Sequence, residues 1–204
     1  MRTLLNIFCV AILLSGCAPP IQPVSDSTTP VVAKGFSVLP PKGDYWFQMG
    51  GSDTYRVMFG KTTPDEIKQK KSVILTAEIL HATKKHDIRT PEGLKAEVDT
   101  YSTAKVPRHT LMSYKSSHYH DERLGTDCVR SEVVNEERDN PNYPGIVFLI
   151  TGSIVTCRHP LSPDTVVVVG YSDRRPVDAA SMLNDAVRNE IEWSVKSLEF
   201  LPVR

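Results

Sequence analysis

Two apolar runs in the second half of the chain decide its fold: Ile146-Val147-Phe148-Leu149-Ile150 and Val166-Val167-Val168-Val169. A strand with one wet face alternates apolar and polar residues, whereas these runs are apolar at every position. Both are rich in β-branched residues, which favours strands over helices. The runs therefore predict two central strands in a sheet that is covered on both faces.

Further strands are predicted on both sides of these runs. In the second half they occupy His109–His118, Thr126–Glu136, Gly145–Cys157 and Thr165–Ser172. Upstream, the sequence predicts a short strand at Gly35–Leu39, a hairpin of Tyr45–Met49 with Tyr55–Phe59, and a strand at Ser72–His81. Because short connections follow one another, neighbouring strands should be antiparallel.

Three helices are predicted to pack on this sheet. Thr63-Pro64-Asp65-Glu66 has the pattern of a capping box and begins a short helix, and Thr90-Pro91-Glu92 begins a second one. A long C-terminal helix is predicted from about Asp178. Its apolar face is formed by Leu183, Val187, Ile191, Val195 and Leu198. The predicted fold class is α+β: an antiparallel β-sheet covered by helices on both faces, an α/β/α sandwich.

The order of these elements resembles the Mog1/PsbP-like domains. The resemblance runs from the opening Gly-Phe-Ser-Val-Leu-Pro-Pro at 35–41, through the series of strands, to a closing helix that ends in Ser197-Leu198-Glu199-Phe200. It implies the sandwich fold only. No functional residue is transferred by it, because a fold does not determine a function.

The N-terminus predicts a secretory signal peptide over residues 1–16. Leu4–Leu14 is an apolar run of eleven residues, which as a helix would span only about half of a bilayer core. Leu14-Ser15-Gly16-Cys17 then resembles the bacterial lipobox. The resemblance implies a diacylglycerol thioether on Cys17, cleavage before it and acylation of the new amino group. The alternative is an ordinary signal peptide with Cys17 free or disulfide-bonded.

The residues after Cys17 predict the address of the protein and a tether. Residue 18 is Ala and not the Asp that resembles an inner-membrane retention signal, which favours the outer membrane with the domain facing the periplasm. Surface display is the alternative. Residues 17–33 are predicted to be the lipidated Cys and a tether, because Ala18–Ala33 holds four prolines and a Ser/Thr cluster. Residues 34–204 should form a single globular domain.

The charge balance bears on the choice of partner. The chain has 24 Lys and Arg against 24 Asp and Glu, so it has no overall field that would attract nucleic acid. We therefore predict no nucleic-acid partner. The predicted membrane contact is made through the Cys17 lipid and does not depend on charge.

Cys128 and Cys157 are predicted to form a disulfide. An oxidising compartment favours a bond between the two cysteines. The midpoint between them lies in the predicted loop Asp139–Pro144, so a hairpin centred there would place the two residues opposite each other. The alternatives are a redox-active pair and a metal site that includes His159.

Two further pairs are candidates for binding sites. His118 and His120 would point to the same face of a strand and could bind zinc or copper. The alternative is a polar strand end that runs into a turn. Arg174 and Arg175 end the valine strand and could bind an anion, although surface arginines more often pair with nearby acids.

The sequence contains none of the common catalytic motifs, such as Gly-x-Ser-x-Gly, His-Glu-x-x-His or a P-loop. We therefore predict a non-enzymatic lipoprotein that binds a protein partner or acts as a scaffold in the cell envelope, and we predict no cofactor. The alternatives are a lipoprotein that binds a small ligand or a metal, and an unrecognised hydrolase.

Overall fold

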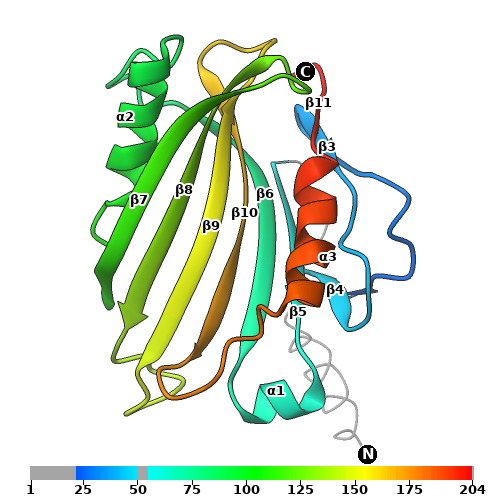
Figure 1. The fold of residues 1–204 in the computed structure, drawn as a ribbon, viewed down its shortest axis with the longest axis vertical. Coiled ribbons are helices and arrows are strands. Elements are labelled where there is room, and N and C mark those ends of the chain that lie inside the picture. The colour runs from blue at the N-terminus through cyan, green and yellow to red at the C-terminus, as the bar shows by residue number, and fades with distance from the viewer. Residues whose placement is uncertain (1–21, 50–54, 204) are drawn as a thin grey trace, which may run out of the picture.

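The computed structural model describes residues 22–49 and 55–203. Strands account for 44% of these residues and helices for 16%. The dominant element is one antiparallel sheet of eight strands in the order β1-β4-β5-β6-β10-β9-β8-β7, drawn in Figure 1. A second sheet of three strands has the order β11-β3-β2.

The bounds of the elements are as follows. The large sheet contains β1 (Gln22–Pro23), β4 (Trp46–Met49), β5 (Arg56–Lys61), β6 (Ser72–His81), β7 (His109–Asp121), β8 (Thr126–Glu137), β9 (Phe148–Arg158) and β10 (Thr165–Pro176). The small sheet contains β2 (Val31–Ala33), β3 (Phe36–Val38) and β11 (Glu199–Phe200). Helices in the described part of the chain are α1 (Pro64–Lys68), α2 (Pro91–Ser102) and α3 (Asp185–Lys196).

The valine run lies within β10, and the other apolar run enters β9 at Phe148; both strands are interior, as predicted. Strand β10 pairs with β6 on one side and with β9 on the other, and Val167 lies opposite Cys157. The predicted hairpin of β4 and β5 is also confirmed by their antiparallel pairing. Its predicted turn, Gly50-Gly51-Ser52-Asp53, lies outside the described residues.

The helices begin where polar side chains cap their first turn. Thr63 and Glu66 form the predicted capping box of α1, and Thr90 accepts a hydrogen bond from the Gly93 backbone at the start of α2. The prediction for the C-terminal helix was wrong about its start. Helix α3 begins at Asp185, because the Asn184 side chain accepts a hydrogen bond from the Val187 backbone and ends the preceding loop.

The large sheet has two sides, which we name after the helix on each. On the α3 side, Val187 and Ile191 of the helix pack with a large apolar cluster that includes Phe59, Leu75 and Val167. On the α2 side, a small cluster joins α2 to the start of β8 and of β10 and to the end of β6. Its members are Ile88, Leu94, Val98, Val129 and Val166.

The predicted α/β/α sandwich is wrong: this is a mostly β structure with few helices. Helices α2 and α3 have 12 residues each and are therefore about 18 Å long, whereas eight strands side by side span about 34 Å. Helix α2 contacts β7 and β8, and α3 contacts β10. Ile150 and Ile154 of the apolar strand β9 consequently stay only half-buried on the α2 side. An apolar run predicts that a strand is interior, but it does not say what covers its faces.

Part of the predicted tether pairs with the domain. Gln22 lies opposite Gln48 in the large sheet, and Ala33 lies opposite Phe36 in the small sheet. The predicted signal peptide, Cys17 and residues 18–21 lie outside the described residues. Among the residues that are described, no helix has both the length and the apolar character needed to cross a bilayer.

Candidate functional site

The predicted disulfide joins the two strands that follow β7. Cys128 of β8 lies directly opposite Cys157 of β9, with their Cα atoms 4.1 Å apart and their sulfur atoms bonded. Both residues are fully buried in the cluster on the α3 side. The disulfide and the hairpin that predicted it are therefore confirmed, and the two thiols serve to hold β8 against β9.

His159, the residue proposed as an alternative metal ligand beside Cys157, is buried and fully hydrogen-bonded. Its Nδ1 accepts a hydrogen bond from the Leu161 backbone, so its Nε2 carries the proton and donates to the Gly35 and Leu201 carbonyls, at 2.9 and 3.1 Å. Through these hydrogen bonds, His159 connects three backbone segments. It does not share a metal site with Cys157, because the sulfur of that cysteine is used in the disulfide.

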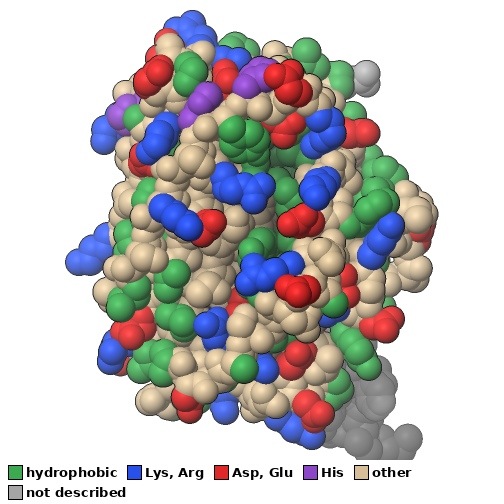
Figure 2. Space-filling model, in the orientation of Figure 1, with side chains coloured by type: hydrophobic (Ala, Val, Ile, Leu, Met, Phe, Trp, Pro, Cys, Tyr) green, Lys and Arg blue, Asp and Glu red, His purple; other side chains and the backbone are tan. Residues whose placement is uncertain are grey.

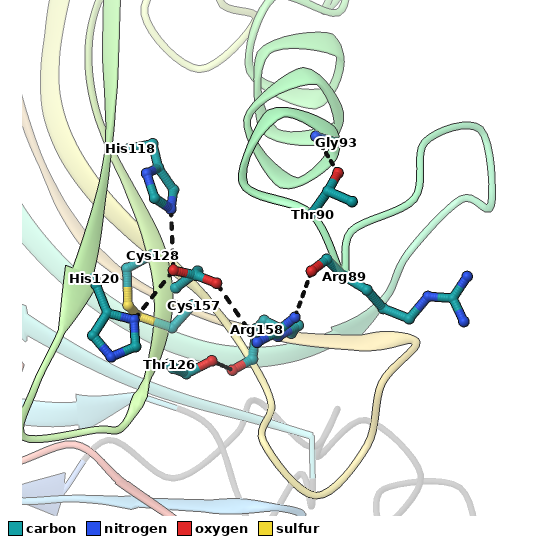
Figure 3. Close-up of polar contacts among 10 residues, drawn as sticks. Arg89, Thr90, Gly93, His118, His120, Thr126, Cys128, Cys157 and Arg158 are labelled. Atoms are coloured by element: carbon teal, nitrogen blue, oxygen red, sulfur yellow. Dashed lines mark hydrogen bonds and ion pairs between the residues drawn. A yellow bond between two sulfur atoms is a disulfide. The ribbon is translucent and has the colours of Figure 1, made fainter.

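His118 and His120 both contact one carboxylate close to the turn between β7 and β8, as Figure 3 shows. Nε2 of His118 lies 3.3 Å and Nδ1 of His120 lies 3.2 Å from Oδ1 of Asp127. The other carboxylate oxygen, Oδ2, lies 3.6 Å from Nη2 of Arg158. Three neighbouring strands, β7, β8 and β9, thus supply one polar cluster.

Arg158 connects this cluster to the start of α2. Its Nη1 donates a hydrogen bond of 2.8 Å to the Arg89 carbonyl, just before the N-cap Thr90, and its own carbonyl accepts one from Thr126 (Figure 3). Burial by itself raises the pKa of Asp127, but hydrogen bonds from His120 and His118 and the charge of Arg158 outweigh it, so the pKa is lowered. The carboxylate is therefore ionised at neutral pH and holds the strands and the helix together.

A metal role for His118 and His120 stays a prediction. A cation at this position would compete with Arg158 for the Asp127 carboxylate. In the described ranges, no three His, Cys, Asp or Glu side chains are grouped in a way that could hold a metal ion.

Arg174 and Arg175 point to opposite sides of β10 and have separate partners. Arg174 donates to Glu137 at 2.8 Å, and its guanidinium lies 3.5 Å from the centre of the Phe148 ring. Arg175 donates to the buried Asp173 at 2.7 Å. The two arginines are not brought together, and each neutralises a carboxylate inside the fold.

A groove on the α3 side brings together residues that sequence reasoning did not connect. Figure 2 shows a hollow between the strands and α3, with hydrophobic side chains at its floor and Lys and Arg side chains along its rims. We call it the α3 groove. Its volume is about 140 Å³, and it is lined by Arg130, Ser153, Val155, Val169, Tyr171, Arg188, Ile191, Glu192, Val195 and Lys196. A second hollow, lined by Lys115, Ser116, Ser117, Arg130 and Glu132, continues it toward the β7 edge.

Positive charge exceeds negative charge around the α3 groove. The two hollows are lined by four cations, Lys115, Arg130, Arg188 and Lys196, against two carboxylates, Glu132 and Glu192. Lys196 lowers the pKa of Glu192 through a hydrogen bond, and Arg130 adds to this from the opposite rim. The groove therefore combines an apolar floor with a cationic rim that keeps the Glu192 carboxylate ionised.

No signal in the sequence could have found the α3 groove. Arg130 belongs to β8 and Arg188 to α3, and each stands alone among residues of mixed character. Only the packing of α3 across the sheet places the two guanidinium groups on one groove.

Comparison with known proteins gives a weak likeness among solved structures. No protein-family model and no curated protein matches this chain. Among solved structures, the chain is similar to LpqN, described as involved in cell envelope biogenesis of Mycobacterium tuberculosis. The TM-score is 0.46 at 14% identity, over 85% of this chain and 90% of LpqN. A likeness at this level transfers neither the role nor the sites of LpqN. The resemblance to Mog1/PsbP-like domains is not shown by these comparisons, and the sandwich fold that it implied is contradicted by the structure.

Proposed function

We propose that this chain is a non-enzymatic lipoprotein of the bacterial cell envelope, anchored through an acylated Cys17, whose domain binds a protein partner in the α3 groove. The proposed location is the outer membrane, with the domain in the periplasm. The partner supplies a segment in which acidic residues stand beside apolar ones.

The α3 groove is the observation that carries this proposal. Its apolar floor of Val155, Val169 and Tyr171 favours burial of apolar side chains, and the arginines and lysines on its rim favour a carboxylate beside them. At about 140 Å³ the groove is smaller than the roughly 300–1,000 Å³ of pockets that enclose a small ligand. A protein segment that lies across it needs no such enclosure.

The anchor and the disulfide support the compartment. The lipobox at Leu14–Cys17 implies export and acylation, and a buried Cys128–Cys157 bond is typical of proteins that fold in an oxidising environment. Replacing Cys17 by Ser should abolish acyl-chain labelling and release the protein from the membrane fraction. A Cys17→Ser protein that still carries acyl chains would contradict the anchor.

The partner can be captured from the native envelope. A photo-reactive amino acid at Ser117, which is exposed at the edge of the groove, should cross-link to an envelope protein. The same amino acid at Glu92, exposed on α2, is the matched control and should give no such adduct.

Charge reversal then tests the role of the rim. We expect Arg130→Glu combined with Arg188→Glu to remove the Ser117 adduct, since the rim would then repel the acidic partner. The control reverses two exposed lysines away from the groove, Lys68→Glu with Lys85→Glu, and should leave the adduct unchanged. Recovery of the monomer alone from the Ser117 protein, or equal loss of the adduct in both double variants, would contradict the proposal.

A further inference from the structure

The α2 side of the large sheet carries a strip of apolar residues near the β4 edge. Val57 and Phe59 of β5, and Val73 and Leu75 of β6, point into the cluster on the α3 side. Because side chains alternate along a strand, the residues between them point to the α2 side. We call these residues the apolar strip: Phe47 and Met49 of β4, Met58 of β5 and Ile74 of β6.

The packing around Gly60 confirms this orientation. A Cβ atom at Gly60 would lie 2.6 Å from the Phe47 ring and 3.0 Å from the Met49 sulfur. Both side chains therefore lie over the glycine, on the same side of the sheet as Met58, which is paired with Met49. All four residues of the strip are half-buried.

Helices α2 and α3 leave the apolar strip uncovered. Helix α2 contacts β7 and β8, several strands away, and α3 lies on the opposite side of the sheet. In the cluster under α2, the residues of β6 and β10 come from their ends near Leu80 and Val166, and no residue of the strip is part of it.

The position of β1 indicates what lies against the strip. Strand β1 pairs with β4, opposite Phe47 and Gln48, and is the outermost strand at this edge of the sheet. Only four residues, 18–21, lie between Cys17 and Gln22. Even fully extended, the five Cα-to-Cα steps from Cys17 to Gln22 span no more than about 18 Å. An acyl anchor on Cys17 would therefore keep the β4 edge, and the strip beside it, close to the bilayer surface.

We propose that the apolar strip rests on the bilayer that holds the acyl chains of Cys17. The proposal rests on the predicted acylation and goes beyond the α3 groove, which lies on the other side of the same sheet. With the strip on the lipid, the α3 groove faces away from the membrane and is open to a partner in the aqueous compartment. The β7 edge is then the part of the sheet farthest from the anchor, by about seven strand spacings or roughly 34 Å.

Spin labels on the full mature protein test this orientation. The protein is extracted from its host and reconstituted into vesicles of phosphatidylethanolamine and phosphatidylglycerol. Met58→Cys carries the label on the strip, and Ser117→Cys, exposed on the α3 side, is the matched control. Because Cys128 and Cys157 are bonded to each other, the introduced cysteine is the thiol that reacts.

The expected result is a clear difference between the two labels. Collisions with oxygen, which concentrates in lipid, should exceed those with a water-soluble nickel complex several-fold at Met58→Cys, and the ratio should be reversed at Ser117→Cys. Ile74→Cys is a second reporter on the strip, in case Met58→Cys does not keep the disulfide and the thermal transition of the wild type.

Three outcomes would overturn the proposal. Acylated protein in which the strip label collides freely with nickel would place the strip in water. A strip label shielded from both oxygen and nickel would mean that protein, such as a second copy, covers the strip. Host protein without acyl chains would remove the anchor and this orientation together, but it would leave partner capture at the α3 groove as a separate result.

Discussion

The two sides of the large sheet are built differently. On the α3 side, nineteen buried residues form one cluster with contributions from the sheet, α3 and the small sheet. On the α2 side, the corresponding cluster has five buried residues, gathered under α2. Buried apolar area is the main source of stability, so the α3 side should hold most of the folding free energy.

The two sides of the sheet therefore differ in what they contain: the α3 side holds the main core and the α3 groove, and the α2 side holds a small cluster and the apolar strip. Layers on the α3 side bury the core and leave a groove between helix and strands. On the α2 side, α2 packs on the sheet where it contacts β7 and β8. Toward the β4 edge of the same side, the residues of the apolar strip are half-buried. The apolar strip on the α2 side is the surface that we propose rests on the bilayer.

The largest expected effect comes from the core of the α3 side. Phe59→Ala removes a buried ring from the centre of the large cluster and should cost about 4 kcal/mol of unfolding free energy. Leu94→Ala, the matched change under α2, should cost about 3 kcal/mol. Urea denaturation measures both. A larger loss for Leu94→Ala would reverse the ranking of the two sides.

Removing the disulfide is expected to cost slightly less. The Cys128–Cys157 bond closes a loop with a sequence separation of 29, for which chain entropy predicts about 3–4 kcal/mol. The double variant Cys128→Ala with Cys157→Ala should lose this amount in a thermal or urea transition. Reducing the wild type should have the same effect, while the double variant should not respond to reductant.

A smaller loss is expected on the α2 side, at the ion pair of Arg174 with Glu137. Arg174→Met leaves the buried Glu137 carboxylate with Asn140 as its side-chain donor and should cost about 2 kcal/mol at neutral pH. Burial raises the pKa of Glu137, but hydrogen bonds from Arg174 and Asn140 and the charge of Arg174 outweigh it and lower the pKa.

The lowered pKa fixes the sign of the pH dependence. Glu137 contributes stability above its unfolded pKa of about 4.3, and this contribution is lost as the pH falls through its lower folded pKa. The wild type should therefore lose more stability than Arg174→Met on acidification below about pH 4. Parallel stability profiles for the two proteins would show that the pair does not couple to folding.

The smallest effects should come from the helix caps, which compare the two sides directly. Thr90→Ala removes the cap of α2 and Asn184→Ala removes the cap of α3, each at about 1 kcal/mol. Hydrogen exchange should show that α2 frays over more of its length, because fewer apolar contacts hold it to the sheet. Equal protection of both helices after these changes would argue against a weaker attachment of α2.

Most of the strands and two of the helix starts could be predicted from the sequence, because the patterns that mark them lie within one short segment. The two apolar runs predicted interior strands, and the capping residues at Thr63 and Thr90 marked helix starts. The symmetry of the loop at 139–144 between Cys128 and Cys157 predicted the disulfide, because an antiparallel hairpin pairs residues at equal distances from its turn.

The errors arose where distant segments compete for the same surface. Apolar runs in β9 and β10 were interpreted as covered by helices, but two helices of twelve residues cannot cover a sheet of eight strands. Prolines in residues 18–33 predicted a tether, yet β1 and β2, two short strands in this segment, find partners in the domain. The partner of Arg174 was hidden because Glu137 is remote in sequence, whereas the pairing of Arg175 with Asp173, two residues away, fits the alternative that surface arginines pair with nearby acids.

The sequence by itself determined the strand pattern, the pairing of Cys128 with Cys157 and the expectation of a lipid anchor at Cys17, since each depends on spacing along one stretch of chain. Only the tertiary structure decided which faces of the sheet are covered, which cations meet at the α3 groove and where β1 holds the chain next to the apolar strip. Those features depend on the packing of segments that lie tens to more than a hundred residues apart. No local pattern encodes which of them will meet.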